Sequence, residues 1–126
     1  GSGLAYKSCC QPYISGRSSA PTAEALMRSR FSAFALKKAN YLKKTVKMPA
    51  AKHFVDLDLK DDTRCWYKLE IISTVAGKLS DDIGEVSFKA YYKLDSATDF
   101  DRIKCLSERS LFKKVAGRWY YVDKLD

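Results

Sequence analysis

One amphipathic segment, Pro21–Val46, sets the strongest limit on how this chain can fold. It is the only long run in the sequence with helical periodicity. Its apolar residues recur at intervals of three and four, as on the buried face of a helix, and the lysines fall mostly on other faces. These apolar positions are Leu26, Met27, Phe31, Ala33, Phe34, Ala35 and Leu42. A helix with such a face must be covered by a second layer of structure.

The ends of the helical segment are also marked in the sequence. Thr22 follows Pro21 and can cap the free N–H groups of the first turn, and Glu24 places a carboxylate near the positive end of the helix dipole. Asn40 is a weak helix former. We therefore expect a helix that begins beside Thr22, and a break at Asn40 between a longer helix and a shorter one.

The covering layer is expected from strands in the second half of the chain. Polar loops or tight turns separate four segments with strand patterns: Cys65–Ala76, Glu85–Leu94, Arg102–Val115 and Arg118–Asp123. In the first of them, alternation places Leu69 and Ile71 on one face and Trp66 on the other. Lys47–Arg64 is expected to connect helices and strands, with a short extended stretch at Val55–Leu59. Helices followed by a strand meander predict an α+β fold, in which a curved antiparallel sheet covers the helices.

Composition and charge narrow the class of protein. Apolar residues make up 46% of the 126 residues and aromatic residues 13%, which is typical of a folded globular domain. No apolar run approaches the ~20 residues of a membrane span, and no signal sequence is evident, so we expect a cytoplasmic protein that does not contact membranes. Residues 1–60 hold eleven Lys and Arg against three acidic residues, whereas residues 61–126 hold twelve of each sign. This basic half suits a protein or nucleic-acid partner, or forms a solvated helix face.

Cys9 and Cys10 are the most distinctive pair in the Gly- and Ser-rich first 20 residues. Neighbouring cysteines bridge each other poorly because the disulfide geometry is strained across one peptide bond. Paired thiolates suit a soft metal such as zinc, which takes four ligands. The remaining candidate ligands, Cys65, Cys105 and His53, are distant in sequence.

Several motifs resemble one known family. GSGLAYKSCC, residues 1–10, is similar to the second half of the zinc-binding SEC-C motif, Cys-x-Cys-Gly-Ser-Gly-x-x-Tyr-x-x-Cys-Cys. PYISG, PTAEALMRSRFSAF, YLKKT, ERSLF and GRWYYVD resemble segments of the YchJ-like family of bacterial proteins. The resemblance implies a truncated SEC-C-like arm at residues 1–20 and a nuclear transport factor 2-like (NTF2-like, or cystatin-like) domain at residues 21–126.

The same resemblance bears on metal binding. Its zinc ligands are the motif's cysteines, of which this sequence carries Cys9 and Cys10 but not the leading Cys-x-Cys. We therefore expect a metal half-site, with zinc bound by a chain that has the complete motif and none by this one. The resemblance implies no particular reaction.

A cavity is expected where a curved sheet closes on a helix. The side chains that we predict as its lining are Arg28, Arg30, Trp66, Tyr91, Tyr92, Glu108, Arg109 and Trp119. An arginine there would anchor a small anionic or aromatic ligand through two parallel hydrogen bonds. In the alternative interpretation, Arg30 and Glu108 pair with each other and tie the helix to the sheet.

The sequence predicts no catalytic residue. It has no Ser/His/Asp arrangement, phosphate-binding Gly loop or dinucleotide fingerprint, and its single histidine, His53, lies in a loop-like stretch. We therefore predict a small cytoplasmic binding or interaction module with a partial zinc motif and a basic helical face. The alternative is a pocket protein for a small molecule, or an enzyme that uses an Arg/Glu-lined cavity. Exposed aromatic side chains such as Trp66 and Tyr91 would suit a homodimer.

Overall fold

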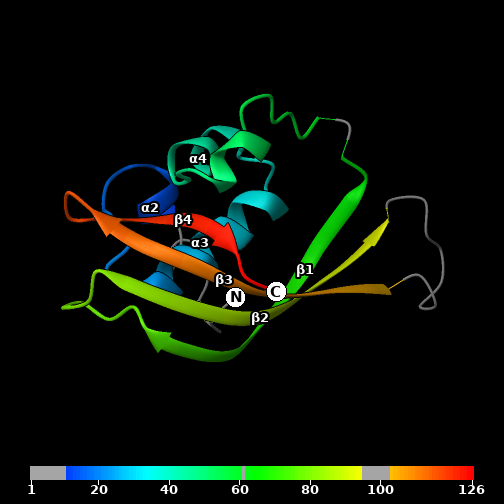
Figure 1. Ribbon diagram of the computed structural model, residues 1–126. Helices are drawn as coiled ribbons and strands as arrows, with labels where there is room; N and C mark the ends of the chain where they lie inside the picture. Colours follow the sequence, from blue (N-terminus) through cyan, green and yellow to red (C-terminus); the bar gives the residue numbers. More distant parts are fainter. Residues whose placement is uncertain (1–10, 61, 95–102) are drawn as a thin grey trace.

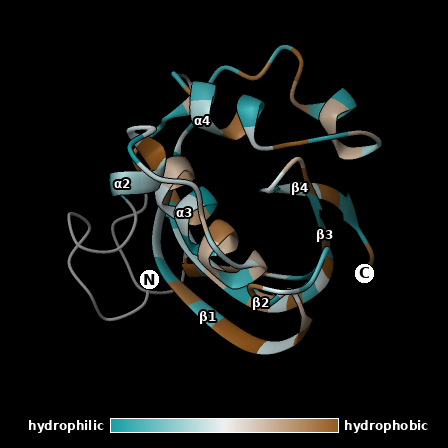
Figure 2. Ribbon diagram, turned by 90° about the vertical axis from the view of Figure 1, so that its left-hand side faces the viewer, coloured by the Kyte–Doolittle hydropathy of each residue, from teal (hydrophilic) through white to brown (hydrophobic). Residues whose placement is uncertain are grey.

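A computed structural model of the chain describes residues 11–60, 62–94 and 103–126, and within them a curved sheet wraps around one helix (Figures 1 and 2). The helices are α2 (Gln11–Ile14), α3 (Ala23–Ala35), α4 (Ala39–Lys44) and the 3-10 helix η1 (Ala50–His53). The strands are β1 (Arg64–Ala76), β2 (Ile83–Leu94), β3 (Ile103–Val115) and β4 (Arg118–Lys124). They pair antiparallel in the order β1-β2-β3-β4, so the predicted α+β meander is confirmed.

The beginning of α3 follows the sequence prediction. Thr22 has an extended backbone, and its Oγ1 accepts a hydrogen bond from the Ala25 N–H at 3.0 Å. Glu24 lies in the first turn, where its charge opposes the helix dipole. Thr22 is therefore the N-cap of α3.

The predicted break at Asn40 is wrong, because α3 ends earlier and Asn40 lies inside α4. Lys37 adopts a left-handed backbone with φ 60°. This geometry lets the Lys38 N–H donate to the Ala33 carbonyl at 2.7 Å and the Lys37 N–H to the Phe34 carbonyl at 3.2 Å. That pair of bonds is a Schellman motif, which ends the helix without a glycine.

Replacing Lys37 with glycine is expected to raise stability relative to Lys37→Ala by about 1 kcal/mol, because only glycine adopts a left-handed backbone without steric cost. Alanine is the appropriate reference, since both variants lose the hydrogen bond from Lys37 Nζ to the Asp62 carbonyl. Urea unfolding of the two variants measures the difference. Equal midpoints and slopes would contradict the assigned backbone strain.

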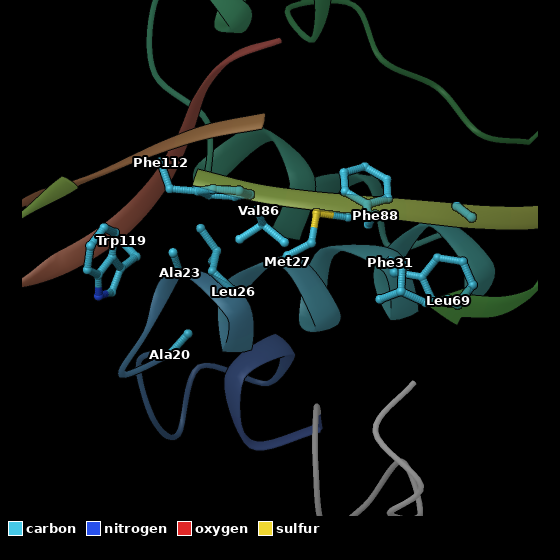
Figure 3. Packing of buried hydrophobic residues seen from close by; sticks show 11 residues of the cluster. Ala20, Ala23, Leu26, Met27, Phe31, Leu69, Val86, Phe88, Phe112 and Trp119 are labelled. Atoms are coloured by element: carbon cyan, nitrogen blue, oxygen red, sulfur yellow. The ribbon is translucent and has the colours of Figure 1, made fainter. Parts of the chain in front are cut away.

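The main core lies between α3 and the concave face of the sheet. Leu26 and Met27 of α3 lie against Val86 and Phe88 of β2, and Phe112 of β3 is fully buried beside them (Figure 3). A second cluster, made of Ala33, Tyr41, Leu42 and Leu59, joins α3 to α4 and to the segment before β1. The apolar face predicted for residues 21–46 is therefore covered from two sides.

Trp66 faces the core, so its predicted position on the opposite face from Leu69 is wrong. The pairing of β1 with β2 shifts between Trp66 and Lys68, and Tyr67 has no partner in the register. Such a bulge inserts one residue and reverses the alternation of side chains. Trp66 consequently packs edge-on against Phe31 at 6.2 Å between ring centroids, while Tyr67 is 50% exposed.

The segment after α4 closes one edge of the sheet and contains the 3-10 helix η1. The Lys47 N–H donates to the Tyr121 carbonyl at 2.9 Å, and the Tyr121 N–H donates to the Thr45 carbonyl at 2.9 Å. Val46 forms a parallel bridge with Tyr121 of β4. The predicted extended stretch at 55–59 belongs to no strand. Phe54, just before it, lies over the concave face, where its ring contacts that of Tyr121.

Within the described residues, no helix has the length and apolar character to cross a membrane.

Candidate functional site

A cavity of about 150 Å³ opens between α3, the concave face of the sheet and the segment after η1. Its walls are mainly aromatic and apolar: Met27, Phe31, Phe34, Phe54, Trp66, Phe88, Ala90 and Leu106. Its polar groups are Arg30, Arg64, Glu108, Ser110 and Tyr121. A mostly apolar pocket with a few converging polar groups is typical of a small-molecule site.

Arg30 is the central polar group of this cavity and is only 3% exposed. Its Nη1 donates to the Leu42 carbonyl at 2.9 Å and to Thr45 Oγ1 at 2.6 Å. Its guanidinium carbon lies over the rings of both Phe54 and Tyr121, 5.1 Å from each centroid, where the ring faces attract a cation. Nε and Nη2 donate to no acceptor among the described residues, so they are available to a ligand.

The alternative in which Arg30 pairs with Glu108 is not observed. None of the ion pairs in the described part of the chain involves Arg30 or Glu108. Glu108 Oε2 instead accepts hydrogen bonds from Ser110 Oγ and from the Tyr121 hydroxyl, the latter at 3.3 Å. Oε1 of Glu108 accepts from no described donor. The cavity therefore holds a cation and a carboxylate that are each partly satisfied by neutral groups.

Burial controls the ionisation of two of these groups. Removal from water lowers the pKa of Arg30 to about 10, while the nearby Tyr121, Tyr41 and Glu108 oppose that change. Arg30 thus remains positively charged at neutral pH. Burial also raises the pKa of Tyr121, and the negative charge of Glu108 raises it further. Tyr121 is therefore a neutral hydrogen-bond donor.

Trp66 carries a buried donor that no described group satisfies. Its Nε1–H is buried and has no hydrogen-bond partner. Leaving such a donor unsatisfied costs roughly 1–3 kcal/mol. Buried polar groups without a hydrogen-bond partner are therefore rare in native proteins. The Trp66 ring is held in place by Tyr92 at 4.6 Å and by Phe34 at 6.4 Å between centroids.

The structure brings together three of the predicted lining residues and places the others elsewhere. Arg30, Trp66 and Glu108 line the cavity. Tyr92 packs behind Trp66, and Trp119 is buried in the core with its Nε1 donating to the Pro21 carbonyl at 3.2 Å.

The three remaining candidates are held by other partners. Arg28 pairs with Glu24 one turn earlier on α3 at 3.0 Å. Arg109 follows Glu108 along β3 and so points to the convex face, where it pairs with Glu85 and Asp126. Tyr91 also lies on that face, with its hydroxyl 3.4 Å from Glu70 Oε1. Trp66 is absent from the convex face, so the proposed dimer surface lacks one of the aromatic side chains predicted for it.

Sequence reasoning missed seven polar or aromatic lining residues: Phe31, Phe34, Phe54, Arg64, Phe88, Ser110 and Tyr121. Ser110 could have been found, because it is two residues from Glu108 on the same face of β3. Tyr121 could also have been found, because it lies two residues after the inward-facing Trp119 in the unshifted part of β4. Phe54 comes from the connecting segment, and no periodicity in the sequence indicates its position.

The predicted metal half-site, Cys9 and Cys10, lies outside the described residues. Within the described ranges, no group of three or more His, Cys, Asp or Glu side chains could hold a metal ion. The metal half-site, with zinc bound only by a chain that has the complete motif, stays a prediction.

Comparison with known proteins connects this fold to a family. Residues 22–124 match the family model described as the YchJ middle NTF2-like domain. A UPF0225 protein of Corynebacterium glutamicum is 42% identical over 122 residues, which cover 96% of this chain and 90% of that protein. A UPF0225 protein of Pectobacterium carotovorum is 37% identical over 124 residues, with 97% and 78% covered.

Solved structures agree with the family model. The solution structure of a SEC-C motif containing protein from Rhodopseudomonas palustris has a TM-score of 0.82 and 31% identity, covering 98% of this chain and 93% of that one. The crystal structure of a SEC-C motif containing protein from Psychrobacter arcticus has a TM-score of 0.73 and 36% identity, with 98% and 73% covered. The NTF2-like fold expected from the sequence is confirmed. The chain belongs to the YchJ family of UPF0225 proteins, with its middle NTF2-like domain at residues 22–124.

Proposed function

We propose that this chain binds a small planar molecule carrying one carboxylate, in the cavity between α3 and the concave face of the sheet. The observation that carries the proposal is the state of Arg30. Its guanidinium is buried and charged, it has no carboxylate partner in the described residues, and Nε and Nη2 retain N–H groups without acceptors.

A carboxylate suits this arrangement for electrostatic and geometric reasons. A buried cation without a counter-ion has lost its hydration, so an incoming anion restores a favourable environment. The guanidinium fork presents parallel N–H groups that match the two oxygens of a carboxylate. Because Asp62 already neutralises Arg64 and Glu108 lines the same cavity, a second negative charge on the ligand would be repelled. The site therefore favours a single negative charge.

The cavity walls and volume indicate the rest of the ligand. Phe31, Phe34 and Trp66 offer ring faces and edges on which a planar group stacks favourably. A cavity of about 150 Å³ accommodates one six-membered ring. Oε1 of Glu108 can accept a hydrogen bond from a hydroxyl or amino substituent on that ring. A hydroxylated or amino-substituted aromatic carboxylate fits all of these features.

Fluorescence titration of the full chain tests this proposal, because Trp66 lines the cavity. We expect benzoate and 4-hydroxybenzoate to change the tryptophan emission in a saturable way. Benzamide and benzyl alcohol, which share the ring but lack the negative charge, should bind at least about tenfold more weakly, as expected for a lost charge-assisted pair. Equal binding of carboxylate and amide would contradict the role of Arg30, and no saturation by any ring acid would contradict the proposal as a whole.

A further inference from the structure

We infer a second binding site, for a phosphoryl group, in a separate cavity between the turn after α2, the end of α4 and the start of β4. This cavity also has a volume of about 150 Å³. Lys44 and Arg118 line it, together with the hydroxyl-bearing residues Ser18, Ser19, Tyr13 and Tyr120. None of its lining residues carries a carboxylate.

The two cations of this second cavity are not neutralised by the described residues. The ion pairs among the described residues involve Arg28, Arg64 and Arg109, and none of them involves Lys44 or Arg118. Further positive charge lies alongside, because Lys47 Nζ sits 4.6 Å from the centroid of the Tyr120 ring. Cations gathered around a concave surface reinforce one another's potential and attract anions. The second cavity is thus suited to a ligand with more than one negative charge.

The position of Lys44 makes this a defined site instead of a diffuse basic surface. Gly16, in the turn after α2, has φ 86°, and a Cβ built on it would lie 3.9 Å from Lys44 Nζ. The Lys44 Nζ atom also lies 5.7 Å from the centroid of the Tyr41 ring. The lysine is therefore directed across the cavity toward the turn that carries Ser18 and Ser19.

A phosphoryl group matches these donors better than a carboxylate does. Its three oxygens can accept bonds from an ammonium, a guanidinium and hydroxyls at the same time, and its second charge has no carboxylate to repel it here. Arg118 can bind two oxygens through its fork, whereas Lys44 acts as a point charge. Tyr13 and Tyr120 provide aromatic surface for an organic group attached to the phosphate.

This inference is independent of the carboxylate site. The two cavities share no lining residue, although Thr45, in the wall of the second, accepts a hydrogen bond from Arg30 in the first. Glu108 makes the first cavity unfavourable for a dianion, while the absence of acidic lining residues makes the second favourable. The two ligands can therefore be distinguished by charge.

Titration of the isotope-labelled full chain with inorganic phosphate and with phenyl phosphate, followed by NMR at constant ionic strength, tests the inference. We expect saturable shifts of the Ser18, Ser19 and Thr45 amide signals. Lys44→Met and Arg118→Met should each weaken binding roughly fivefold or more, as for one lost charge-assisted contact at an accessible site. Lys43→Met and Lys124→Met remove the same charge from positions outside the cavity and should stay within about twofold of the unmodified chain.

The two probes separate the sources of the phosphoryl group. Tighter binding of phenyl phosphate identifies a phosphate ester, and equal binding identifies free phosphate; either supports the site. An equal loss in Lys43→Met and Lys44→Met would show a diffuse field and overturn the inference, as would shifts that never saturate. Saturating benzoate, which we expect to occupy only the first cavity, should leave phosphate binding unchanged, so failure at one cavity is not failure at the other.

Discussion

Replacing Gly84 with alanine is expected to destabilise the fold by about 3 kcal/mol or more, the range of severe steric overpacking. A Cβ at Gly84 would lie 2.4 Å from the Gly77 Cα and 2.8 Å from the Gly77 nitrogen. Both are backbone atoms, so no side chain can rotate away. Gly77 is itself held in place, since its N–H donates to the Ile83 carbonyl at 3.0 Å and its carbonyl accepts from the Ala23 N–H at 2.9 Å.

This substitution tests how α3 is joined to the sheet. The contact brings together the end of β1, the beginning of β2 and the first residue of α3, so relief of the clash would move the helix that carries Arg30. Urea unfolding followed by circular dichroism measures the loss. Gly117→Ala is the control, because a Cβ there meets nothing within 4 Å and only the left-handed backbone, with φ 81°, costs energy. A smaller loss at Gly84 than at Gly117 would contradict the close approach.

Replacing Arg30 with methionine is expected to weaken binding of the ring carboxylate about 100-fold, the sum of two charge-assisted hydrogen bonds and the lost counter-charge. Stability should change far less, by about 1 kcal/mol or less in either direction, because a buried charge is replaced by an apolar chain of similar length. Two contributions to the free energy of unfolding oppose each other. Burying methionine requires no loss of hydration of a charge, which stabilises the fold, but the Leu42 carbonyl loses its donor, which destabilises it.

Arg28→Met is the matched control, since Arg28 lies on the same helix and pairs with Glu24 away from the cavity. It should bind benzoate as the unmodified chain does. Arg30→Lys keeps the charge but not the fork and should show an intermediate affinity. Fluorescence titration and urea unfolding of all three variants separate binding from folding. If Arg30→Met bound benzoate normally while folded, Arg30 would not be the anchor.

The large elements of this fold were predictable because they depend on patterns within short stretches of chain. The apolar spacing of residues 21–46 predicted the helices, and alternation in the second half predicted all four strands. Thr22 marked the beginning of α3 through a contact three residues away. Each of these signals is local, and the structure confirms them. The break after α3 was misplaced because a lysine occupies a left-handed position that usually takes glycine.

The candidate site was only partly predictable because it depends on register and on a connecting segment. Glu108 could be assigned to the inner face by alternation, and Arg30 by its place on the helix. Trp66 reached the cavity through a shift in strand pairing, which reverses side-chain direction and is not visible in the periodicity of the sequence. Phe54 depends on a path of the chain that no pattern describes.

The amino-acid sequence by itself determined the layers of this protein, its family and the concentration of positive charge in its first 60 residues, since periodicity, motifs and composition are properties of the chain alone. The tertiary structure decided which charges meet. It separated Arg30 from Glu108 by giving each a neutral partner, and it placed Arg109 on the opposite face of the sheet. Hydrogen bonds and packing contacts act over a few ångströms. Residues distant in sequence come within that range only when the strands have paired, with their bulges, and the helix has packed on the sheet.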